Sequence, residues 1–235
     1  LNKLISGSDQ RINRFRDAKN NSIHLKNYIY FFYAVIEKIL LMLKIESNLP
    51  IINYDAIKIF KILLKNKISV LEFGSGRSTI WWSKQNIKKI VSVESDKFWN
   101  KNISKKLYEL NNRKIDYVFT KNIKKYTSVG KKEKFDLIIV DGIFRDKCIN
   151  YILKYNIHKN TIIYLDDSDA DCSIQKKYSK FSEARKSEYL MLKHSLEYNR
   201  VIYHCRNFSP THLFVKEGSF SIPRSFEKVF KKIIS

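Results

Sequence analysis

Short apolar runs alternate along the middle of the chain with longer stretches in which apolar side chains recur every three or four residues. The longer stretches predict amphipathic helices at 53–65, 96–110 and 148–155. The short runs predict strands at 68–73, 89–93, 115–119, 137–140 and 161–165. The fourth run is apolar throughout, which is typical of a strand covered on both faces. This alternation, without an internal repeat, predicts a parallel sheet with helices on both faces.

The last third of the chain has a different pattern. Two apolar runs at 201–205 and 213–216 are joined by Asn207-Phe208-Ser209-Pro210, which predicts a closing antiparallel hairpin. The charged stretch at 173–197 is predicted to be a helix, and the basic stretch at 225–234 a short surface helix.

The stretch at 23–45 has a long helical pattern in which the polar side chains share one narrow stripe. It is too short and too interrupted to predict a transmembrane span. We expect it either to pack on the domain as a lid or oligomerisation helix, or to lie in a membrane interface. The chain is expected to have three parts, namely a basic N-terminal segment with this helix at 1–47, an α/β domain at 48–220 and a basic tail helix at 221–235.

A glycine turn follows the first predicted strand and precedes a helix expected to start near Ser78 or Thr79. Gly74 and Gly76 allow a tight turn and the close approach of a ligand, and free amides at the helix start favour anionic or polar groups. A plain structural turn has the same pattern. Glu94 ends the second strand, 20 residues beyond Gly74, where open α/β sheets carry the carboxylate that binds a ribose.

Glu72 adds a second carboxylate beside the glycine turn. A carboxylate at this place suits a cofactor that carries an ammonium group better than one that carries a pyrophosphate. The pair of sites therefore points away from NAD and toward S-adenosylmethionine.

Four segments carry motifs in a fixed order: Val70-Leu71-Glu72-Phe73-Gly74-Ser75-Gly76-Arg77-Ser78-Thr79, Val91-Ser92-Val93-Glu94, Phe135-Asp136-Leu137-Ile138-Ile139-Val140-Asp141-Gly142 and Ile162-Ile163-Tyr164-Leu165-Asp166-Asp167. In order and spacing they resemble the class I S-adenosylmethionine-dependent methyltransferases. The resemblance implies a Rossmann-like seven-stranded sheet, mostly parallel with a C-terminal antiparallel hairpin. It also implies S-adenosylmethionine as cofactor, bound by Glu72, Gly74, Ser75, Gly76, Ser78, Glu94 and Asp141.

The chain departs from the motifs of that family at two places. Ser78 stands where many members have a third glycine, and no acidic residue follows the third strand, where Thr120-Lys121-Asn122 stands.

Carboxylates gather after the fourth and fifth predicted strands. Asp141 follows the one, Asp166 and Asp167 follow the other, and the carboxyl ends of neighbouring parallel strands meet at one edge. Converging carboxylates repel one another unless a cation or a proton lies between them. By resemblance, these three positions match those at which metal-dependent O-methyltransferases hold magnesium, which would lower the pKa of the attacking hydroxyl. Metal-free catalysis, with Asp141 or Asp166 as base or orienting group, is the alternative.

Three further charged residues near this cluster have open roles. Asp169 or Asp171 is predicted to cap the following helix. Arg145 is expected either to hold an anionic group of the acceptor or to form a surface ion pair with Asp146 or Asp171.

The chain is strongly basic, with a formal net charge of +22 and a pI near 9.8. Such a charge favours nucleic acid or an anionic membrane as partner. However, 35 of the 45 basic residues are Lys, and Asn and Ile are also abundant, as expected from an AT-rich coding region. Asp141-Gly142-Ile143-Phe144 also lacks the Asn/Asp-Pro-Pro-aromatic element of base-amino methylases.

Three widely spaced cysteines disfavour a zinc site or a disulfide framework and favour a reducing cytoplasm. The first 22 residues are polar and basic, which is not the pattern of a cleavable signal. The chain begins at Leu1 rather than Met, which fits an unusual start codon or an incomplete N-terminus.

These observations together favour an enzyme that methylates a hydroxyl of a carbohydrate or small-molecule acceptor with S-adenosylmethionine and magnesium, in polysaccharide or glycolipid assembly. An RNA or other nucleic acid methyltransferase is the less favoured enzymatic alternative. A non-catalytic, membrane-peripheral protein that uses residues 23–45 is the third. We expect a cytoplasmic protein whose helix at 23–45 contacts a membrane surface peripherally in the second of the two arrangements given above.

Overall fold

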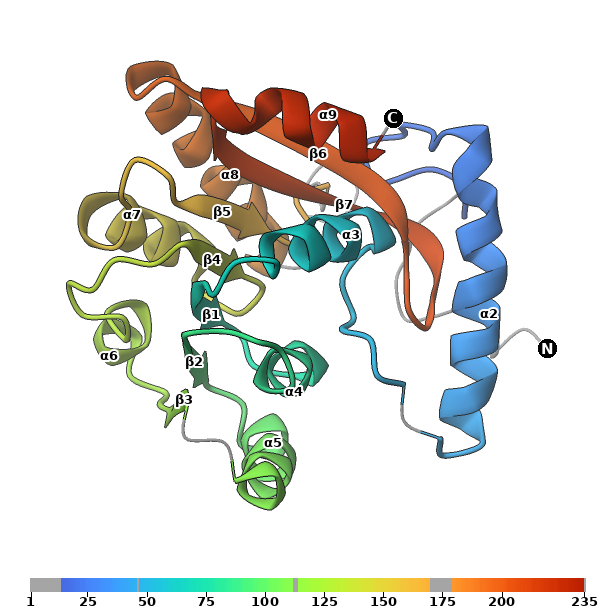
Figure 1. The fold of residues 1–235 in the computed structure, drawn as a ribbon, viewed down its shortest axis with the longest axis horizontal. Coiled ribbons are helices and arrows are strands. Elements are labelled where there is room, and N and C mark those ends of the chain that lie inside the picture. Colours follow the sequence, from blue (N-terminus) through green and yellow to red (C-terminus); the bar gives the residue numbers. More distant parts are fainter. Residues whose placement is uncertain (1–13, 46, 112–113, 170–178, 235) are drawn as a thin grey trace.

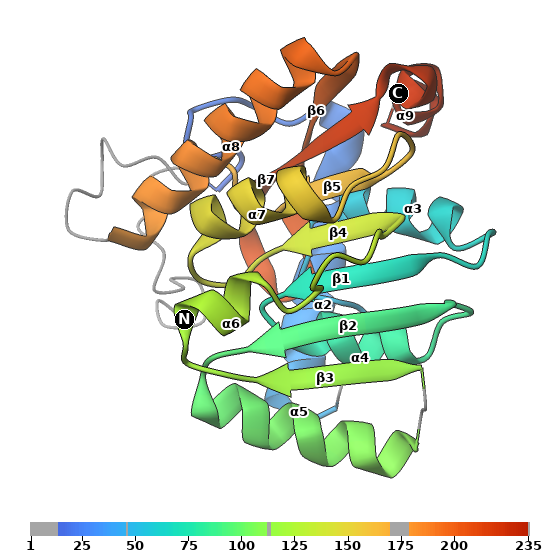
Figure 2. The same cartoon turned by 90° about the vertical axis from the view of Figure 1, so that its left-hand side faces the viewer.

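The computed structural model describes residues 14–45, 47–111, 114–169 and 179–234. Its centre is a seven-stranded sheet in the order β3-β2-β1-β4-β5-β7-β6, in which β7 is antiparallel to both neighbours (Figure 2). The predicted fold class is therefore confirmed. The strands are β1 (Ser69–Phe73), β2 (Lys89–Glu94), β3 (Ile115–Phe119), β4 (Leu137–Val140), β5 (Ile162–Leu165), β6 (Arg200–Ser209) and β7 (His212–Pro223).

Helices cover both faces of the sheet (Figures 1 and 2). Side chains of α2, α3, α4 and α9 form one buried cluster on one face, and side chains of α6, α7 and α8 form a second cluster on the other. The helices are the short η1 (Leu25–Tyr28), α2 (Ile29–Met42), α3 (Tyr54–Leu63), α4 (Arg77–Ser83), α5 (Lys97–Leu110), α6 (Ile123–Thr127), α7 (Arg145–Tyr155), α8 (Ser179–Glu197), η2 (Arg224–Phe226) and α9 (Glu227–Ile234).

The closing hairpin is longer than the sequence predicts. β6 has ten residues and β7 twelve, and the expected domain end at residue 220 falls inside β7. Ser221, beyond that position, is paired with Ile163 of β5 and with Ile202 of β6. The polar run from Lys216 to Ser219 does not look like a strand, yet it is buried because its side chains find polar partners inside the protein.

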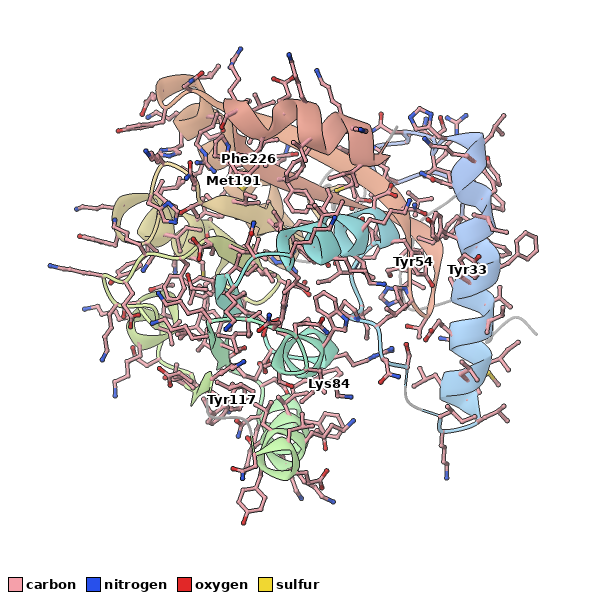
Figure 3. The ribbon with its side chains drawn as sticks, in the orientation of Figure 1. Tyr33, Tyr54, Lys84, Tyr117, Met191 and Phe226 are labelled. Carbon is pink, nitrogen blue, oxygen red and sulfur yellow. The ribbon has the colours of Figure 1, made fainter. Side chains whose placement is uncertain are left out.

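The apolar N-terminal stretch forms η1 and α2, and α2 lies beside the β6–β7 hairpin (Figure 1). Ala34 is fully buried, and the ring of Tyr30 stacks on Tyr54 of α3 with centroids 4.8 Å apart. Tyr33 also approaches Tyr54, as Figure 3 shows. Other large apolar side chains of this helix point outward, including Phe32 at 61% exposure. In the described part of the chain, no helix is both long and apolar enough to cross a membrane.

The carboxyl ends of the parallel strands are in register. Phe73 at the end of β1 is paired with Val93 of β2 and with Val140 of β4, and Val140 is paired in turn with Leu165 of β5. The residues that follow these positions therefore meet at one edge of the sheet.

Candidate active site

A cleft of about 590 Å³ opens at this edge, within the range of about 300–1,000 Å³ that is usual for small-molecule sites. The loops after β1, β2 and β4 line it, together with His212 and Lys216 of β7. The lining includes six of the seven predicted cofactor residues: Gly74, Ser75, Gly76, Ser78, Glu94 and Asp141. Their roles remain predictions, but the fold brings all six to one site.

The two glycines of the loop after β1 have different surroundings. Gly74 has φ +93°, and a Cβ on it would lie 2.6 Å from the Cα of Gly142 in the loop after β4. Gly74 is thus required by the fold. A Cβ on Gly76 would have no atom within 4 Å. Gly76 therefore keeps open a part of the cleft that a cofactor could fill, as the glycine motif predicts.

Glu72, the seventh predicted cofactor residue, does not line the cleft. Its side chain is fully buried behind the loop, where Oε2 accepts hydrogen bonds from the hydroxyls of Thr79 at 2.5 Å and Ser92 at 2.6 Å. The Thr79 hydroxyl in turn accepts the amide of Gly76 at 3.0 Å. Burial raises the pKa of Glu72. Glu72 therefore supports the glycine loop from behind and does not present a carboxylate to a ligand.

Glu94 joins the loops that follow β1 and β2. Its Oε2 accepts the amide and the hydroxyl of Ser75, each at 3.0 Å, and its Oε1 accepts the amides of Ser95 at 2.6 Å and Asp96 at 2.7 Å. The Ser75 hydroxyl also contacts the hydroxyl of Tyr117, whose pKa is raised to about 12 by burial. A carboxylate is thus held rigidly at the cleft wall, at the position predicted for ribose binding.

The three aspartates after β4 and β5 converge as expected. One carboxylate oxygen from each of Asp141, Asp166 and Asp167 lies within 4.8 Å of the others. Asp141 lines the cleft, whereas Asp166 is fully buried. Burial and the neighbouring Asp166 carboxylate raise the pKa of Asp141 well above its ordinary value.

An ammonium group lies between two of these carboxylates. Lys216 Nζ is 2.9 Å from Asp166 Oδ2 and 3.0 Å from Asp167 Oδ1. The other oxygen of Asp166 accepts the hydroxyl of Tyr164 at 2.6 Å. Burial lowers the pKa of Lys216, but the carboxylates of Asp166 and Asp167 outweigh burial and raise this pKa above its ordinary value. The group is therefore charged.

These contacts test whether the predicted magnesium ligands fit a metal. Both oxygens of Asp166 have donors, and one oxygen of Asp167 is paired with the same ammonium. A divalent ion bound by the three aspartates would have to displace Lys216. The folded arrangement of these side chains does not fit the predicted metal site.

Arg145 supports the same region from α7. Its guanidinium donates to the carboxylate of Asp141 at 3.2 Å and to the carbonyls of Gly142 at 2.9 Å and Asp166. The alternative of a surface ion pair with Asp146 is not what the described residues show, because the guanidinium turns inward to the ends of β4 and β5. Asp171, the other residue named for that pair, lies outside the described residues. Arg145 also lines the cleft, so a contact with the acceptor remains a prediction.

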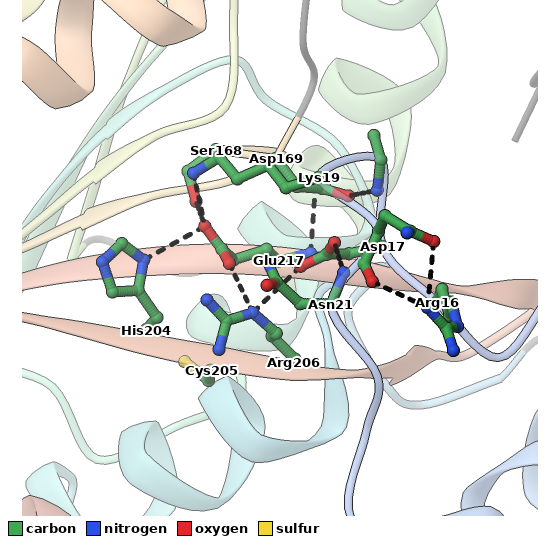
Figure 4. A network of polar contacts seen from close by, with 12 residues as sticks. Arg16, Asp17, Lys19, Asn21, Ser168, Asp169, His204, Cys205, Arg206 and Glu217 are labelled. Atoms are coloured by element: carbon green, nitrogen blue, oxygen red, sulfur yellow. Dashed lines mark hydrogen bonds and ion pairs between the residues drawn. The ribbon is translucent and has the colours of Figure 1, made fainter.

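A second polar network lies behind the turn after β5, around Glu217 (Figure 4). Glu217 Oε1 accepts Lys19 Nζ at 2.8 Å and contacts His204 Nδ1 at 3.0 Å, and Oε2 is 2.6 Å from Arg206 Nε. Asp169, predicted to cap a helix, accepts the amide of Glu217 at 3.1 Å. The N-terminal segment is thereby tied to β6, β7 and this turn.

Asp169 also accepts the amide of Ala18 at 2.9 Å. Asp171, the other predicted cap, lies outside the described residues.

Sequence reasoning missed Lys216 and Tyr164 as parts of the site. The sequence signal at Lys216 is a Lys-Glu pair directly after the apolar run Leu213-Phe214-Val215, because a charge buried in a strand needs a partner. This signal marks the lysine as one that needs a partner, but it does not say which residues that partner would be.

The strand order, the antiparallel β7 and the glycine loop at the carboxyl edge define the fold of the class I S-adenosylmethionine-dependent methyltransferases. No family model and no curated protein sequence matches this chain. Solved structures do match it. A candidate O-methyltransferase from Klebsiella pneumoniae shares 15% identity at a TM-score of 0.59, over 82% of this chain and 97% of that one.

Two ligand-bound structures are also similar. The O-methyltransferase of Bacillus cereus, in complex with SAH, has 15% identity and a TM-score of 0.58 over 79% of this chain and 90% of that one. The O-methyltransferase TomG of Streptomyces achromogenes, in complex with SAM, has 12% identity and a TM-score of 0.56 over 72% and 78%. These likenesses establish that this chain has the class I methyltransferase fold.

Proposed function

We propose that this protein transfers the methyl group of S-adenosylmethionine to a hydroxyl oxygen of a carbohydrate or small-molecule acceptor. One observation carries the proposal: a single cleft has the glycine loop and Glu94 in its wall together with Asp141 and Lys216. A cofactor held by the loop and an acceptor held near Asp141 would share that cleft, so that placement of the two reactants supplies much of the rate. The ligand-bound O-methyltransferases of the same fold support this assignment.

The reaction is a displacement at the methyl carbon of the sulfonium. The acceptor oxygen forms the new C–O bond, the C–S bond breaks with its electron pair remaining on sulfur, and the hydroxyl proton leaves. Asp141 faces the cleft and has a raised pKa, which suits it to accept that proton. Asp166 is fully buried with both oxygens bonded, so it fits an orienting role through Lys216.

The acceptor class rests on the polar side chains that line this cleft. His212, Arg145, Lys216 and Asp141 supply donors and acceptors of hydrogen bonds, which suit a hydroxylated molecule better than an apolar one. The loop after β4 lacks the Asn/Asp-Pro-Pro-aromatic element of the base-amino methylases, which disfavours a nucleobase as the acceptor.

A membrane surface is the proposed partner. α2 exposes large apolar side chains along its outer face, including Phe32 and Ile36, and the chain carries a net charge of +22. Exposed apolar side chains on a helix of a basic protein suit an anionic lipid surface.

Calorimetry of S-adenosylmethionine binding is the first test of the function. Wild type is expected to bind, and Glu94→Gln to bind at least about tenfold more weakly, because glutamine removes the charge predicted to bind the ribose and cannot accept all the loop hydrogen bonds that Glu94 accepts. Glu109→Gln, on the exposed side of α5, is the matched control and should bind as wild type does. Thermal unfolding of each variant checks that the fold is intact.

The acceptor is then identified with labelled S-adenosylmethionine and pools of nucleotide sugars, glycans, RNA and protein. Label in the sugar or glycan pool supports the proposed acceptor. Label in RNA or protein alone would contradict the acceptor, and the absence of cofactor binding in wild type would contradict the function as a whole.

A further inference from the structure

The charges beside the proposed acceptor position are arranged in pairs. Asp141 is paired with Arg145, whose Nη2 is 3.2 Å away, and both Asp166 and Asp167 are paired with Lys216. Three carboxylates thus have two permanent cations among them. Much of the repulsion that a metal ion would otherwise relieve is therefore offset by side chains of this chain, and the part that remains raises the pKa of Asp141.

Lys216 Nζ is held in place by two ion pairs and by the strand that carries it. It lies about 3 Å from one oxygen of each of two aspartates, and its side chain is only 6% exposed. Its backbone is held on the twelve-residue strand β7, where Lys216 is paired with Asn207 of β6. Lys216 also lines the cleft, so the same residue contacts the buried Asp166, contacts the partly exposed Asp167 and borders the space open to a ligand.

We propose that the Lys216 ammonium is the built-in cation of this active site and takes the place of a divalent metal. This inference rests on the proposed function and names the group that assists it. An ammonium has three donors, and Asp166 and Asp167 take two of them. The third donor bonds the acceptor oxygen and stabilises the negative charge that develops there while the C–O bond forms.

Two consequences distinguish this arrangement from a metal site. Methyl transfer by wild type does not depend on added magnesium and is not inhibited by a chelator. Removal of the lysine side chain leaves three carboxylate oxygens within 4.8 Å of one another with space at their centre, which creates a site for a hard divalent cation. The Lys216→Ala variant therefore gains metal binding that wild type lacks.

The decisive test uses Mn²⁺ alone, followed by electron paramagnetic resonance, and needs no acceptor. Lys216→Ala is expected to bind Mn²⁺ at least about tenfold more tightly than wild type, because two carboxylates lose their cation. Lys216→Ala/Asp167→Asn should lose that binding again. Lys193→Ala, which removes an exposed lysine of α8, is the matched control and should behave as wild type does.

Activity gives the second readout once an acceptor is found. EDTA is expected to leave the wild-type rate within about twofold, whereas Lys216→Ala should lose about 10²-fold and recover part of it with Mg²⁺. The outcome that overturns the proposal is Mn²⁺ binding by wild type as tight as by Lys216→Ala.

A wild-type Mn²⁺ site that Asp167→Asn abolishes overturns the proposal as well, and this comparison stays decisive if Lys216→Ala does not fold. Calorimetry with S-adenosylhomocysteine on the same samples separates the two proposals. If wild type did not bind S-adenosylhomocysteine, the proposed function would be refuted. The Mn²⁺ result is independent of that measurement, and it decides whether Lys216 or a metal ion is the cation of the site.

Discussion

At the scale of single residues, one added methyl group distinguishes the two glycines of the loop after β1. The position of Gly74 is closed by backbone, because its Cβ would lie 2.6 Å from Gly142. The position of Gly76 is open, because its Cβ would meet nothing within 4 Å. The same substitution at the two sites should therefore separate a requirement of the fold from a requirement of the ligand.

Gly74→Ala is expected to destabilise the fold by at least about 1–3 kcal/mol, since alanine at φ +93° is strained even without the clash. Gly76→Ala is expected to keep the wild-type unfolding temperature and to weaken cofactor binding by about tenfold, because its Cβ fills space reserved for a ligand. Thermal unfolding measures the loss of stability in Gly74→Ala, and calorimetry measures the loss of cofactor affinity in Gly76→Ala.

If Gly76→Ala were folded and bound the cofactor as tightly as wild type does, the space beside Gly76 would not be the cofactor site.

The convergence of the three aspartates could be predicted from the sequence, and the lysine between them could not. Asp141 and Asp166 each follow a strand, and neighbouring parallel strands end at one edge of a sheet. Lys216 reaches them only because β7 inserts between β5 and β6. That insertion depends on which strand of the hairpin pairs with β5, and no local pattern in the sequence states it.

At the scale of elements, the short parallel strands were the most predictable. The partly exposed edge strand β3 and the buried strand β4 both begin and end at the predicted residues, because each is a short run with abrupt polar ends. β7 was predicted much too short, because Lys216, Glu217 and Ser219 break the apolar pattern. Their burial is compensated by distant partners such as Lys19, which local sequence cannot reveal.

The helix α5 shows a related limit of periodicity. Its apolar side chains recur at helical spacing, yet Phe98 is 70% exposed and Trp99 is 43% exposed. Trp99 lines the cleft. An apolar side chain at helical spacing can face either a core or a binding site, and the pattern alone does not distinguish the two.

The outer face of α2 leads to a prediction about a whole helix. Phe32→Glu/Ile36→Glu is expected to reduce binding to vesicles that contain phosphatidylserine by about tenfold or more, because two exposed apolar anchors become charged. Binding by wild type should weaken with added salt and on purely zwitterionic vesicles. Vesicle flotation measures both effects.

The control for that helix is Leu196→Glu, which changes an 80% exposed apolar residue on α8 and should leave vesicle binding unaltered. Equal vesicle binding by wild type and the α2 variant would contradict the membrane contact. If light scattering then showed that wild type is a dimer and the α2 variant a monomer, α2 would be an oligomerisation helix.

At the scale of the whole molecule, the Glu217 network holds together parts that are far apart in the sequence. Lys19 and Arg206 both contact Glu217, and Arg206 also contacts Asp17 at 2.9 Å. The N-terminal segment, the hairpin and the turn that carries Asp166 and Asp167 thereby share one set of charges (Figure 4). Because this turn carries the two aspartates that contact Lys216, we expect loss of the network to affect both the stability of the molecule and the geometry of the cleft.

The pH dependence of stability tests this coupling. Burial raises the pKa of Glu217, but His204 and Lys19 outweigh burial and lower it below its ordinary value of 4.5. A lowered carboxyl pKa stabilises the fold above pH 4.5, and the contribution is lost as the pH falls toward the folded-state pKa. Glu217→Gln is therefore expected to cost about 2 kcal/mol at pH 7, and progressively less below pH 4.5. Urea unfolding of wild type and variant at a series of pH values measures this cost.

Glu227→Gln, at the exposed pair with Lys231, is the control and should change the urea midpoint far less. A Glu217→Gln deficit that stayed constant from pH 7 to pH 3 would show that packing, and not charge, holds the N-terminal segment.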